Sequence, residues 1–383
     1  MNETIAAVAT PFGQGALAVI RLSGVEALPV AGQALGRAPE GLEERHAHRA
    51  KVCAENGVVL DDVVVTVFRG PRSYTGEDVV EISCHGGVLV VQRLLERLLE
   101  CGARSAEAGE FTQRAFLNGK LDLTQAEAVM DVISAQTELA LRAAQHQLGG
   151  RIGVETETLR GEVLEIVAHV EAHIDFPEEN IDPDTGAGLI GRLEGVKARI
   201  DKLLATAEQG RILREGARTV ICGEPNVGKS SLLNVLLGYE RAIVSEVAGT
   251  TRDTVEEVLN VGGIPVRLID TAGMRESVDE IEQRGVERTR QHLAEADLIL
   301  EVVDTSREKG NLLSSESREN RHHLLVLNKS DLGAHPDWNQ EGRGVAISCR
   351  EGTGMDALGE AIGDQLSLGA ASWGQEAVAV NAR

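Results

Sequence analysis

Residues 219–231 read TVICGEPNVGKSS, and this stretch decides the fold of the C-terminal half of the chain. The apolar strand candidate Thr219–Cys222 runs into Gly223–Ser230, which fits the pattern G-x-x-x-x-G-K-[ST]. The apolar segment Leu232–Leu237 follows and predicts the helix that this pattern requires. Glycines in such a loop let backbone N–H groups curl around phosphate oxygens, and the helix N-terminus adds partial positive charge. The stretch therefore predicts a phosphate-binding loop.

The loop assigns chemistry to two side chains. The Lys229 ammonium can reach the terminal phosphates of a nucleotide, and the Ser230 hydroxyl suits Mg²⁺. The alternative is a glycine-rich turn with an incidental lysine. Three further segments argue against that alternative, because each follows a strand candidate: Asp270-Thr271-Ala272-Gly273, Asn328-Lys329-Ser330-Asp331 and Ser348-Cys349-Arg350.

The chemistry of these segments indicates a guanine nucleotide. Asp270 can hold Mg²⁺ through water, and the N–H group of Gly273 is available to a terminal phosphate. The Asp331 carboxylate can accept hydrogen bonds from guanine N1 and the exocyclic amino group, which adenine does not offer. A backbone N–H group within 348–350 would meet the guanine carbonyl. In this order the segments resemble the translation-factor class of small GTPases across residues 214–367, and they predict GTP rather than ATP.

Strands and helices alternate through this half of the chain. Such alternation predicts a parallel sheet that is covered on both faces by helices. Beyond the strand that precedes the loop, the apolar strand candidates are Pro265–Ile269, Leu298–Val303, Leu324–Leu327 and Val345–Ser348.

The chain upstream of the loop has a different character. Residues 1–118 read as mixed α/β, with strand candidates at Ala16–Ile20 and Val63–Phe68. Leucines at helical spacing predict a helix over Val88–Glu100. Residues 121–213 are helical almost throughout, since alanine, leucine and glutamate dominate there.

Two breaks interrupt this helical middle. Gly149-Gly150 forms the first, and the segment from Phe176 to Asn180 forms the second. Pro177 lies in the second break and is expected to end or bend any helix that reaches it.

Composition restricts the possible classes of function. The chain has 383 residues and a net charge of −22, which disfavours a general electrostatic grip on nucleic acid. Its five cysteines are widely spaced and never form CxxC, so neither a disulfide framework nor a zinc knuckle is indicated. No run reaches the ~18 apolar residues of a membrane span, and the N-terminus lacks the layout of a secretory signal. We expect a cytoplasmic protein with no membrane partner.

GTP hydrolysis needs a device to place the attacking water. Ras-like proteins carry a glutamine directly after the DxxG segment, but this chain has Met274, which has no strong donor or acceptor. Asn226 in the loop can help hold a monovalent cation beside the β and γ phosphates, and Glu282 offers a carboxylate. From residue type alone, Asn226 also suits a simple turn and Glu282 a solvated charge.

The segment SEVAGTTRD, residues 245–253, lies between the loop and the third strand candidate. A threonine at such a position can bind Mg²⁺ and sense the γ-phosphate, ordering in the GTP state and releasing in the GDP state. Thr251 is the candidate for the metal, with Thr250 beside it. The alternative is a polar surface loop.

Longer strings narrow the comparison to one family. The N-terminal part carries TIAAVATPFGQGALAVIRLSG (4–24), PRSYTGEDVVEISCHGG (71–87) and AEAGEFTQRAFLNGKLDLTQAEAV (106–129). The C-terminal half carries GEPNVGKSSLLN, AGTTRD and DTAGMRES. Together they resemble the MnmE (TrmE) family of tRNA-modification GTPases over nearly the whole chain.

The resemblance implies a multidomain architecture. An α/β N-terminal domain over 1–118 would bind tetrahydrofolate and form a homodimer. An α-helical domain over 119–213 would follow, with a P-loop GTPase domain of α/β parallel-sheet type inserted over 214–367. Residues 368–383 would begin a second, truncated part of the helical domain.

The resemblance also implies an activity. A potassium-activated GTP hydrolase would work with the flavin-dependent partner MnmG, in a heterotetramer, to install a carboxymethylaminomethyl group at C5 of wobble uridine in tRNA. A 5-formyl- or 5,10-methylene-tetrahydrofolate would supply the one-carbon unit. The other classes considered are a ribosome-assembly or regulatory switch GTPase without tRNA chemistry, and a folate-binding module with a degenerate GTPase. The intact nucleotide motifs and the N-terminal strings disfavour both.

Positions that match the family motifs imply roles for single residues. Asn226, Ser245, Val247 and Thr250 would surround K⁺, Ser230 and Thr251 would hold Mg²⁺, and Glu282 would orient the water, with Asn226 and Thr250 assisting catalysis. Arg21, Glu81 and Lys120 would bind the folate. The full nucleotide set comprises Asn226, Val227, Gly228, Lys229, Ser230, Ser231, Ser245, Glu246, Val247, Ala248, Gly249, Thr250, Thr251, Asp270, Thr271, Ala272, Gly273, Asn328, Lys329, Asp331, Ser348, Cys349 and Arg350.

Two features stand apart from this assignment. The family continues after the GTPase domain into a long helical stretch with a terminal Cys motif, whereas this chain stops at Arg383. Two hypotheses follow: an apolar face is exposed on the helices of 121–213, and, as an alternative to the full activity given above, the chain hydrolyses GTP without modifying tRNA. His85 invites a catalytic interpretation, but with no visible nucleophile the sequence favours a structural histidine on a tight turn.

Overall fold

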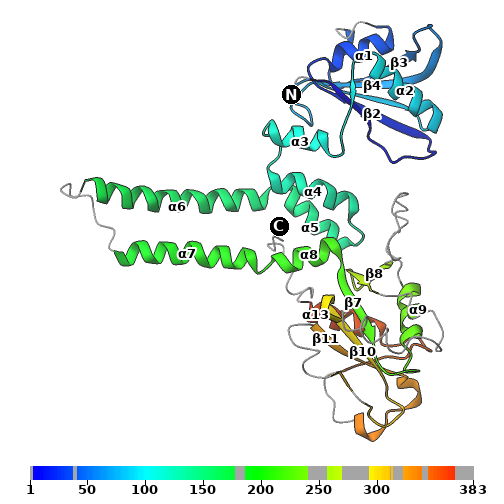
Figure 1. Cartoon of the computed structure of the whole chain (residues 1–383), viewed down its shortest axis with the longest axis vertical. Coiled ribbons are helices and arrows are strands. Elements are labelled where there is room, and N and C mark those ends of the chain that lie inside the picture. The colour runs from blue at the N-terminus through cyan, green and yellow to red at the C-terminus, as the bar shows by residue number, and fades with distance from the viewer. Residues whose placement is uncertain are drawn as a thin grey trace. The chain divides into compact units, whose positions relative to one another are not determined.

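The computed structural model describes residues 3–37, 41–176, 186–239, 257–269, 293–310, 312–313, 322–338 and 344–366. The chain forms two compact units, Met1–Glu127 and Ala128–Arg383. Among the described residues, each unit has one six-stranded sheet and its own buried apolar core (Figure 1).

The sheet of the first unit is mixed, with the strand order β3-β4-β5-β2-β1-β6. Neighbouring strands are antiparallel except for β1 and β6, which are parallel. In β2, side chains alternate between buried and more exposed, because successive residues of a strand point to opposite faces. The strands are β1 (Ile5–Val8), β2 (Leu17–Ser23), β3 (Ala47–Cys53), β4 (Val59–Phe68), β5 (Val79–His85) and β6 (Arg104–Ser105).

Helices α1 (Ala27–Leu35) and α2 (Val88–Glu100) supply the apolar layer that packs on this sheet. The bounds of α2 match the predicted helix, and its residues Val91, Leu94 and Leu98 lie buried on one stripe at helical spacing. The third helix, α3 (Glu110–Leu117), follows β6. The predicted strands at 16–20 and 63–68 are confirmed as parts of β2 and β4.

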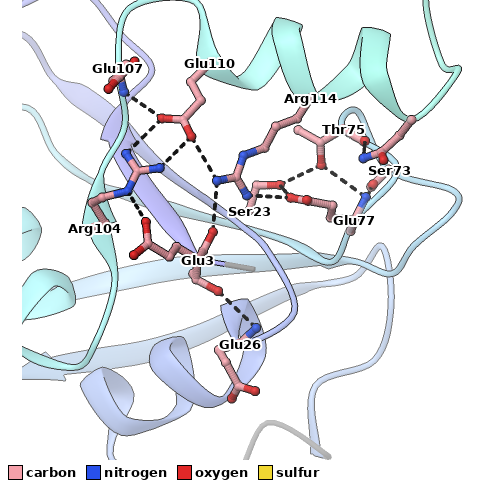
Figure 2. Close-up of polar contacts among 12 residues, drawn as sticks. Glu3, Ser23, Glu26, Ser73, Thr75, Glu77, Arg104, Glu107, Glu110 and Arg114 are labelled. Carbon is pink, nitrogen blue, oxygen red and sulfur yellow. Dashed lines mark hydrogen bonds and ion pairs between the residues drawn. The ribbon is translucent and has the colours of Figure 1, made fainter. Parts of the chain in front are cut away.

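A buried polar network fixes α3 to the first unit (Figure 2). The Arg114 side chain is 2% exposed, and its Nη atoms donate to Glu110 at 2.9 Å, to Glu77 at 3.0 Å and to the backbone carbonyl of Glu3 at 2.9 Å. Arg104 binds the same Glu110 carboxylate, with Nη2 2.8 Å from Oε1. Arg104 and Arg114 thus neutralise carboxylates that folding buries. A buried charge needs such a partner, because burial without one is strongly unfavourable.

The network predicts a loss of stability in acid. The hydrogen bond from Arg104 and the further bonds from Glu107 and Arg114 lower the pKa of Glu110 to about 2, against an ordinary value of 4.5. A carboxyl whose pKa is lowered by folding adds stability above its unfolded pKa and loses it as the pH falls towards the folded pKa. We expect the first unit of the full chain to lose stability between about pH 4.5 and pH 2, and Glu110→Gln to flatten that loss. Urea unfolding monitored by hydrogen exchange at several pH values measures the free energy of unfolding of the first unit. If that free energy falls with decreasing pH as steeply in Glu110→Gln as in the unaltered chain, the prediction is contradicted.

The second unit contains most of the predicted helical middle. The helices are α4 (Leu123–Ser134, which spans the boundary between the units), α5 (Glu138–Leu148), α6 (Arg151–Asp175), α7 (Gly186–Leu204) and α8 (Ala207–Glu215). Both predicted breaks are confirmed at their start: α5 ends before Gly149-Gly150, and α6 ends at Asp175. Helices α6 and α7 lie side by side (Figure 1), with Arg199 bound to Glu155 and Glu162 of α6.

The helical hairpin has an exposed apolar stripe. On α6 the exposed apolar side chains are Val154, Val163, Leu164, Val167, Val170 and Ile174, and on α7 they are Ile190, Leu193, Ile200 and Leu204. Apolar side chains of both helices are thus exposed within the described residues. Among the described residues, no helix is both long and apolar enough to cross a membrane.

The second sheet has the strand order β12-β11-β10-β7-β9-β8. Its strands are β7 (Ala217–Cys222), β8 (Glu257–Val261), β9 (Ile264–Leu268), β10 (Leu298–Asp304), β11 (His322–Asn328) and β12 (Gly344–Ala346). All five predicted strands are present, and their bounds differ from the predicted ones by no more than two residues. The expectation of an all-parallel sheet is wrong at one edge, because β8 pairs antiparallel with β9. The two-residue turn Gly262-Gly263 permits this hairpin, since both residues have positive φ.

Helices that precede and follow the phosphate loop (residues 223–230) complete the apolar core around the second sheet. Helices α9 (Lys229–Tyr239) and α13 (Met355–Gln365) pack beside the parallel strands, with η2 (Ser330–Leu332) and η3 (Pro336–Trp338) as short connections. Ala140 of α5 and Ile212 and Leu213 of α8 belong to the same buried cluster as Leu232 of α9. The end of the helical middle is thus part of the core that supports the phosphate loop.

Candidate functional site

The phosphate loop runs from β7 into α9 and contains two glycines that no other residue can replace without strain. Gly223 has φ +138°, and a Cβ there would lie 2.2 Å from the carbonyl oxygen of Val302. Gly228 has φ +104°, and a Cβ there would lie 2.1 Å from Nδ2 of Asn328. The backbone therefore reaches its curled form only with glycine at both positions.

Lys229 lies in the curl of this loop. Its Nζ atom donates to the carbonyl oxygens of Gly223 at 2.9 Å and Glu224 at 2.8 Å. Burial lowers the pKa of Lys229 below its ordinary value. Ser230 follows in the first turn of α9, where a hydroxyl suits Mg²⁺ beside phosphate oxygens. The residues of the loop therefore fit a nucleotide with its metal ion.

Asn328 connects three of the predicted nucleotide segments. It ends β11, is 2% exposed, and its Nδ2 atom donates to the carbonyl of Val227 in the loop at 2.9 Å. Its Oδ1 atom accepts from the backbone N–H of Cys349 at 3.2 Å. The amide thus holds the phosphate loop against the segment that was predicted to meet guanine.

Asp331 is held in place by a buried hydroxyl. Ser348 is fully buried, and its Oγ atom donates to Oδ1 of Asp331 at 2.7 Å. The second oxygen of this carboxylate makes no hydrogen bond with the described residues, so it can face a ligand. Cys349 lies next to Ser348, and burial raises the pKa of its thiol to about 11, so it remains protonated; Arg350 is exposed.

The structure adds a residue that the sequence interpretation missed. Asp304 ends β10 and is 7% exposed, and its Oδ2 atom lies 2.7 Å from Nζ of Lys329. Burial opposes its ionisation, but hydrogen bonds from Lys329 and Ser306 outweigh this and keep the pKa of Asp304 below its ordinary value. Lys329 also donates to the carbonyl of Asn226 at 3.1 Å. The position of Asp304 at the end of a central parallel strand could have marked it as a candidate for this edge of the sheet, but its pairing with Lys329 is seen only in the structure.

Part of the predicted nucleotide site lies outside the described residues. This holds for Ser245, Glu246, Val247, Ala248, Gly249, Thr250, Thr251, Asp270, Thr271, Ala272, Gly273 and Glu282. Asn226 is described, exposed, and has a positive φ of 65°. The described members of the set converge at the carboxyl ends of β7 and β11, where ligands bind in open parallel sheets.

Gly228→Ala tests the packing of the loop against Asn328. The added methyl group displaces the buried Asn328 amide, which breaks its hydrogen bonds to Val227 and Cys349, and it places a side chain at a positive φ. We therefore expect GTP affinity to fall about 50-fold, or about 2–3 kcal/mol. Fluorescence titration with a labelled GTP analogue measures the affinity. Gly238→Ala is the matched control, since a Cβ at this glycine of α9 meets nothing within 4 Å. Equal affinities for the two variants would contradict the assignment.

The predicted folate residues of the first unit divide into a pair and a separate lysine. Arg21 and Glu81 face each other across β2 and β5, with Arg21 Nη2 2.7 Å from Glu81 Oε1. The guanidinium carbon of Arg21 lies 5.3 Å from the ring centre of Tyr74 and 5.8 Å from that of Phe111. Lys120 donates to the carbonyl of Pro71 at 3.0 Å.

The arrangement leaves polar atoms available to a ligand. Oε2 of Glu81 makes no hydrogen bond within the described part of the chain, and Lys120 is exposed. Two aromatic rings beside an arginine provide stacking surfaces for a flat ring. Sequence interpretation missed Tyr74 and Phe111, although both lie in the strings that carry the family resemblance.

Two family models match the chain. The model described as "GTP-binding protein TrmE N-terminus" covers residues 4–120, and the one described as "MnmE helical domain" covers residues 123–383. This chain belongs to the MnmE (TrmE) family. The phosphate loop described above is therefore that of a GTPase, and the chain is a GTP-hydrolysing enzyme.

Curated relatives named "tRNA modification GTPase MnmE" match at high identity. The relative from Akkermansia muciniphila is 54% identical over 384 residues, covering 100% of this chain and 85% of that protein. The MnmE proteins of Bacillus subtilis and Aquifex aeolicus are 45% and 46% identical, covering 100% and 94% of this chain and 86% and 82% of those proteins. Among solved structures, the FeoB G-domain from Methanococcus jannaschii aligns with 39% of this chain and 98% of its own at 23% identity and a TM-score of 0.30, which adds nothing to the assignment.

Proposed function

We propose that this chain hydrolyses GTP in the service of tRNA modification. With the flavin-dependent partner MnmG it would install a carboxymethylaminomethyl group at C5 of the wobble uridine, and the one-carbon unit would come from a tetrahydrofolate. The observation that carries the proposal is that one chain contains both the phosphate loop with Asp331, which Ser348 holds in place, and the Arg21–Glu81 pair beside aromatic rings. The family name supports tRNA as the substrate.

The nucleotide and its metal ion would be held by residues of the predicted set. Lys229 would exchange its bonds with the loop carbonyls for bonds with phosphate oxygens, and Ser230 with Thr251 would hold Mg²⁺. The metal ion would neutralise charge that develops on the phosphates during hydrolysis. Asp331 would accept from guanine, with Asn328 keeping the two halves of the site together.

The folate would lie against the first unit's sheet. Glu81 Oε2 would accept from N–H groups of the pterin, and Lys120 would pair with a carboxylate of the glutamate tail. Tyr74 and Phe111 would offer their rings to the flat part of the ligand. Titration calorimetry with 5-formyltetrahydrofolate tests this: we propose that Lys120→Ala weakens binding while Lys51→Ala, an exposed lysine on β3, does not.

The assembly is part of the same proposal. The chain would form a homodimer and join MnmG in a heterotetramer that works in the cytoplasm, where tRNA is available. Because the chain has a net charge of −22, it is poorly suited to form the main tRNA-binding surface. MnmG would therefore contribute most of the affinity for tRNA.

Potassium dependence gives the sharpest test of the hydrolysis mechanism. Asn226 is exposed in the loop with a left-handed backbone, so its side-chain oxygen can join a monovalent cation beside the β and γ phosphates. An arginine finger in this place is worth 10³–10⁵ in rate, and we expect K⁺ to raise GTP turnover at least about tenfold over Na⁺. Asn226→Ala should remove the difference.

The control is Asn234→Ala, an exposed asparagine on α9, which follows the loop. This variant should keep the response to potassium. Equal turnover of the unaltered chain in K⁺ and Na⁺ would contradict the role of Asn226 without affecting the assignment of GTP as the substrate.

A further inference from the structure

The loop between β4 and β5 begins with a short stretch of backbone that gathers basic residues from three parts of the first unit. Lys120 Nζ donates to the carbonyl of Pro71 at 3.0 Å, and Arg45 Nη2 donates to the carbonyl of Arg72 at 2.6 Å. Arg69 and Arg72 belong to the stretch itself, and the backbone N–H of Arg72 donates to the carbonyl of Arg69 at 3.0 Å. These four basic residues are called the basic cluster below.

The side chains of the basic cluster are accessible to a ligand. All four residues are exposed, and the side chains of Arg45 and Arg72 are 55% and 78% exposed. Among the described residues, the Arg69 side chain makes neither a hydrogen bond nor an ion pair. That of Arg72 makes only an ion pair with Glu44, 3.9 Å long. Guanidinium N–H groups therefore remain available for an anion from solution.

Two carboxylates bind within the cluster and do not balance its charge. Glu44 lies 3.4 Å from Nε of Arg45 and also pairs with Arg72. Asp78 accepts from the backbone N–H of Gly70 at 2.8 Å. Because the cluster has four basic side chains, it keeps an excess of positive charge in a chain whose net charge is −22. A local excess of this sign raises the concentration of anions at the surface.

The backbone of Arg45 supports a binding role. Its φ is +61°, in the left-handed region, and its N–H donates to the carbonyl of Val67 at 2.8 Å. The other non-glycine residues with positive φ in the described part of the chain are Asn226 and Lys329, and both belong to the nucleotide site. Such conformations cost free energy and cluster at sites of binding and catalysis. Arg45 thus marks the basic cluster as a second place where binding is indicated.

The basic cluster is continuous with the proposed folate site. Tyr74, whose ring lies beside Arg21, follows Arg72 by two residues. The stem of Lys120 packs on Gly76, where a Cβ would lie 3.3 Å from Cγ of the lysine. Lys120 is therefore shared by the two sites. A ligand whose first glutamate carboxylate reaches Lys120 has the arginines of the cluster directly beyond it.

We infer that Arg69 and Arg72, with Arg45 beside them, bind the poly-γ-glutamate tail of a tetrahydrofolate. The inference rests on the proposed function, in which Lys120 pairs with the first glutamate, and it names the form of folate that the site selects. Each further γ-linked glutamate adds one carboxylate, and the planar fork of a guanidinium matches a carboxylate with two parallel hydrogen bonds. An RNA backbone fits less well, because affinity for RNA requires many phosphate contacts and the chain as a whole is acidic.

Titration calorimetry on the full chain with two probes tests the inference. The probes are 5-formyltetrahydrofolate with one glutamate and the same compound with five γ-linked glutamates. An exposed ion pair strengthens binding by up to about fivefold, so we expect the pentaglutamate to bind about tenfold more tightly at low ionic strength. Added salt should reduce this advantage, because the ion pairs are exposed. In Arg69→Gln/Arg72→Gln the two probes should bind within about twofold of each other, with the affinity for the monoglutamate unchanged.

Arg93→Gln is the matched control, since Arg93 is an exposed arginine of α2 in the same unit. It should keep the tenfold advantage of the pentaglutamate. Hydrogen exchange of the first unit should be the same in the double variant and in the unaltered chain, because the substituted side chains are exposed.

The outcomes separate the inference from the proposed function. Equal affinities of the unaltered chain for the two probes, or an advantage that survives in the double variant, would overturn the inference and leave the folate site in place. Binding of neither probe would remove the proposed folate site and the inference with it. A loss of affinity for unmodified tRNA in the double variant, with the advantage of the pentaglutamate retained, would assign the arginines to RNA and overturn the inference.

Discussion

Asp331→Asn should abolish productive GTP binding and create a preference for xanthosine triphosphate. In the proposed site the carboxylate would accept from two N–H groups of guanine, and an amide would turn one of its donors towards the guanine amino group. A site built for particular hydrogen bonds rejects a ligand that leaves them unmade by 10⁴–10⁵, and we expect GTP affinity to fall at least about 10³-fold. Xanthine carries a carbonyl in place of the amino group, so it can accept from the new amide.

Nucleotide titration with both triphosphates measures this exchange. Asp356→Asn is a suitable control, since Asp356 lies in the first turn of α13 and is exposed. It should leave the preference for GTP unchanged. Ser348→Ala should weaken GTP binding without changing the preferred base, because it removes the hydrogen bond that positions Asp331 and the one accepted from the Glu351 N–H but keeps the Asp331 carboxylate itself. Undiminished GTP affinity in Asp331→Asn would contradict the assignment of the guanine site.

Arg114→Met should be among the most destabilising single substitutions in the first unit. The Arg114 side chain is 2% exposed and donates hydrogen bonds to the carboxylates of Glu77 and Glu110 and to the backbone carbonyl of Glu3 (Figure 2). Removal of one partner from a buried ion pair leaves an uncompensated charge and costs about 3–5 kcal/mol. Hydrogen exchange of the full chain should show faster opening of β1, β2 and α3, with the phosphate loop of the second unit unaffected.

Arg93→Met provides the matched control. Arg93 lies on the exposed side of α2 and, among the described residues, pairs only with Glu96, a surface contact 3.3 Å long. Such pairs contribute about 0–1 kcal/mol, so this variant should be nearly neutral. Arg114→Lys retains the charge but not the planar fork, and we expect an intermediate loss. Equal stability of Arg114→Met and Arg93→Met would show that the network is dispensable.

The sequence predicted those features that depend on local pattern. The helix α2 and the break at Gly149-Gly150 follow from leucine spacing and from glycine, and both are observed. The phosphate loop follows from its glycines and lysine, because the backbone geometry at Gly223 and Gly228 excludes other residues. The order of the nucleotide segments along parallel strands then implied that Asn328 and Asp331 lie at one sheet edge.

Features that depend on pairing between distant residues could not be predicted in this way. Asp304 binds Lys329 across neighbouring strands, and Asp61 binds His85 across a gap of 24 residues. Nothing in the sequence near His85 identifies its carboxylate partner. The antiparallel edge strand β8 was missed because a short strand next to a Gly-Gly turn has little pattern of its own.

The most direct test of the central claim joins the two units in one reaction. The full chain, MnmG, unmodified tRNA, a tetrahydrofolate one-carbon donor and glycine are incubated with GTP and K⁺, and tRNA nucleosides are analysed by mass spectrometry. The account predicts 5-carboxymethylaminomethyluridine with GTP and none when GDP replaces it or when Asp331→Asn replaces the unaltered chain. GTP hydrolysis without any modified uridine, or modification that persists with GDP alone, would contradict it.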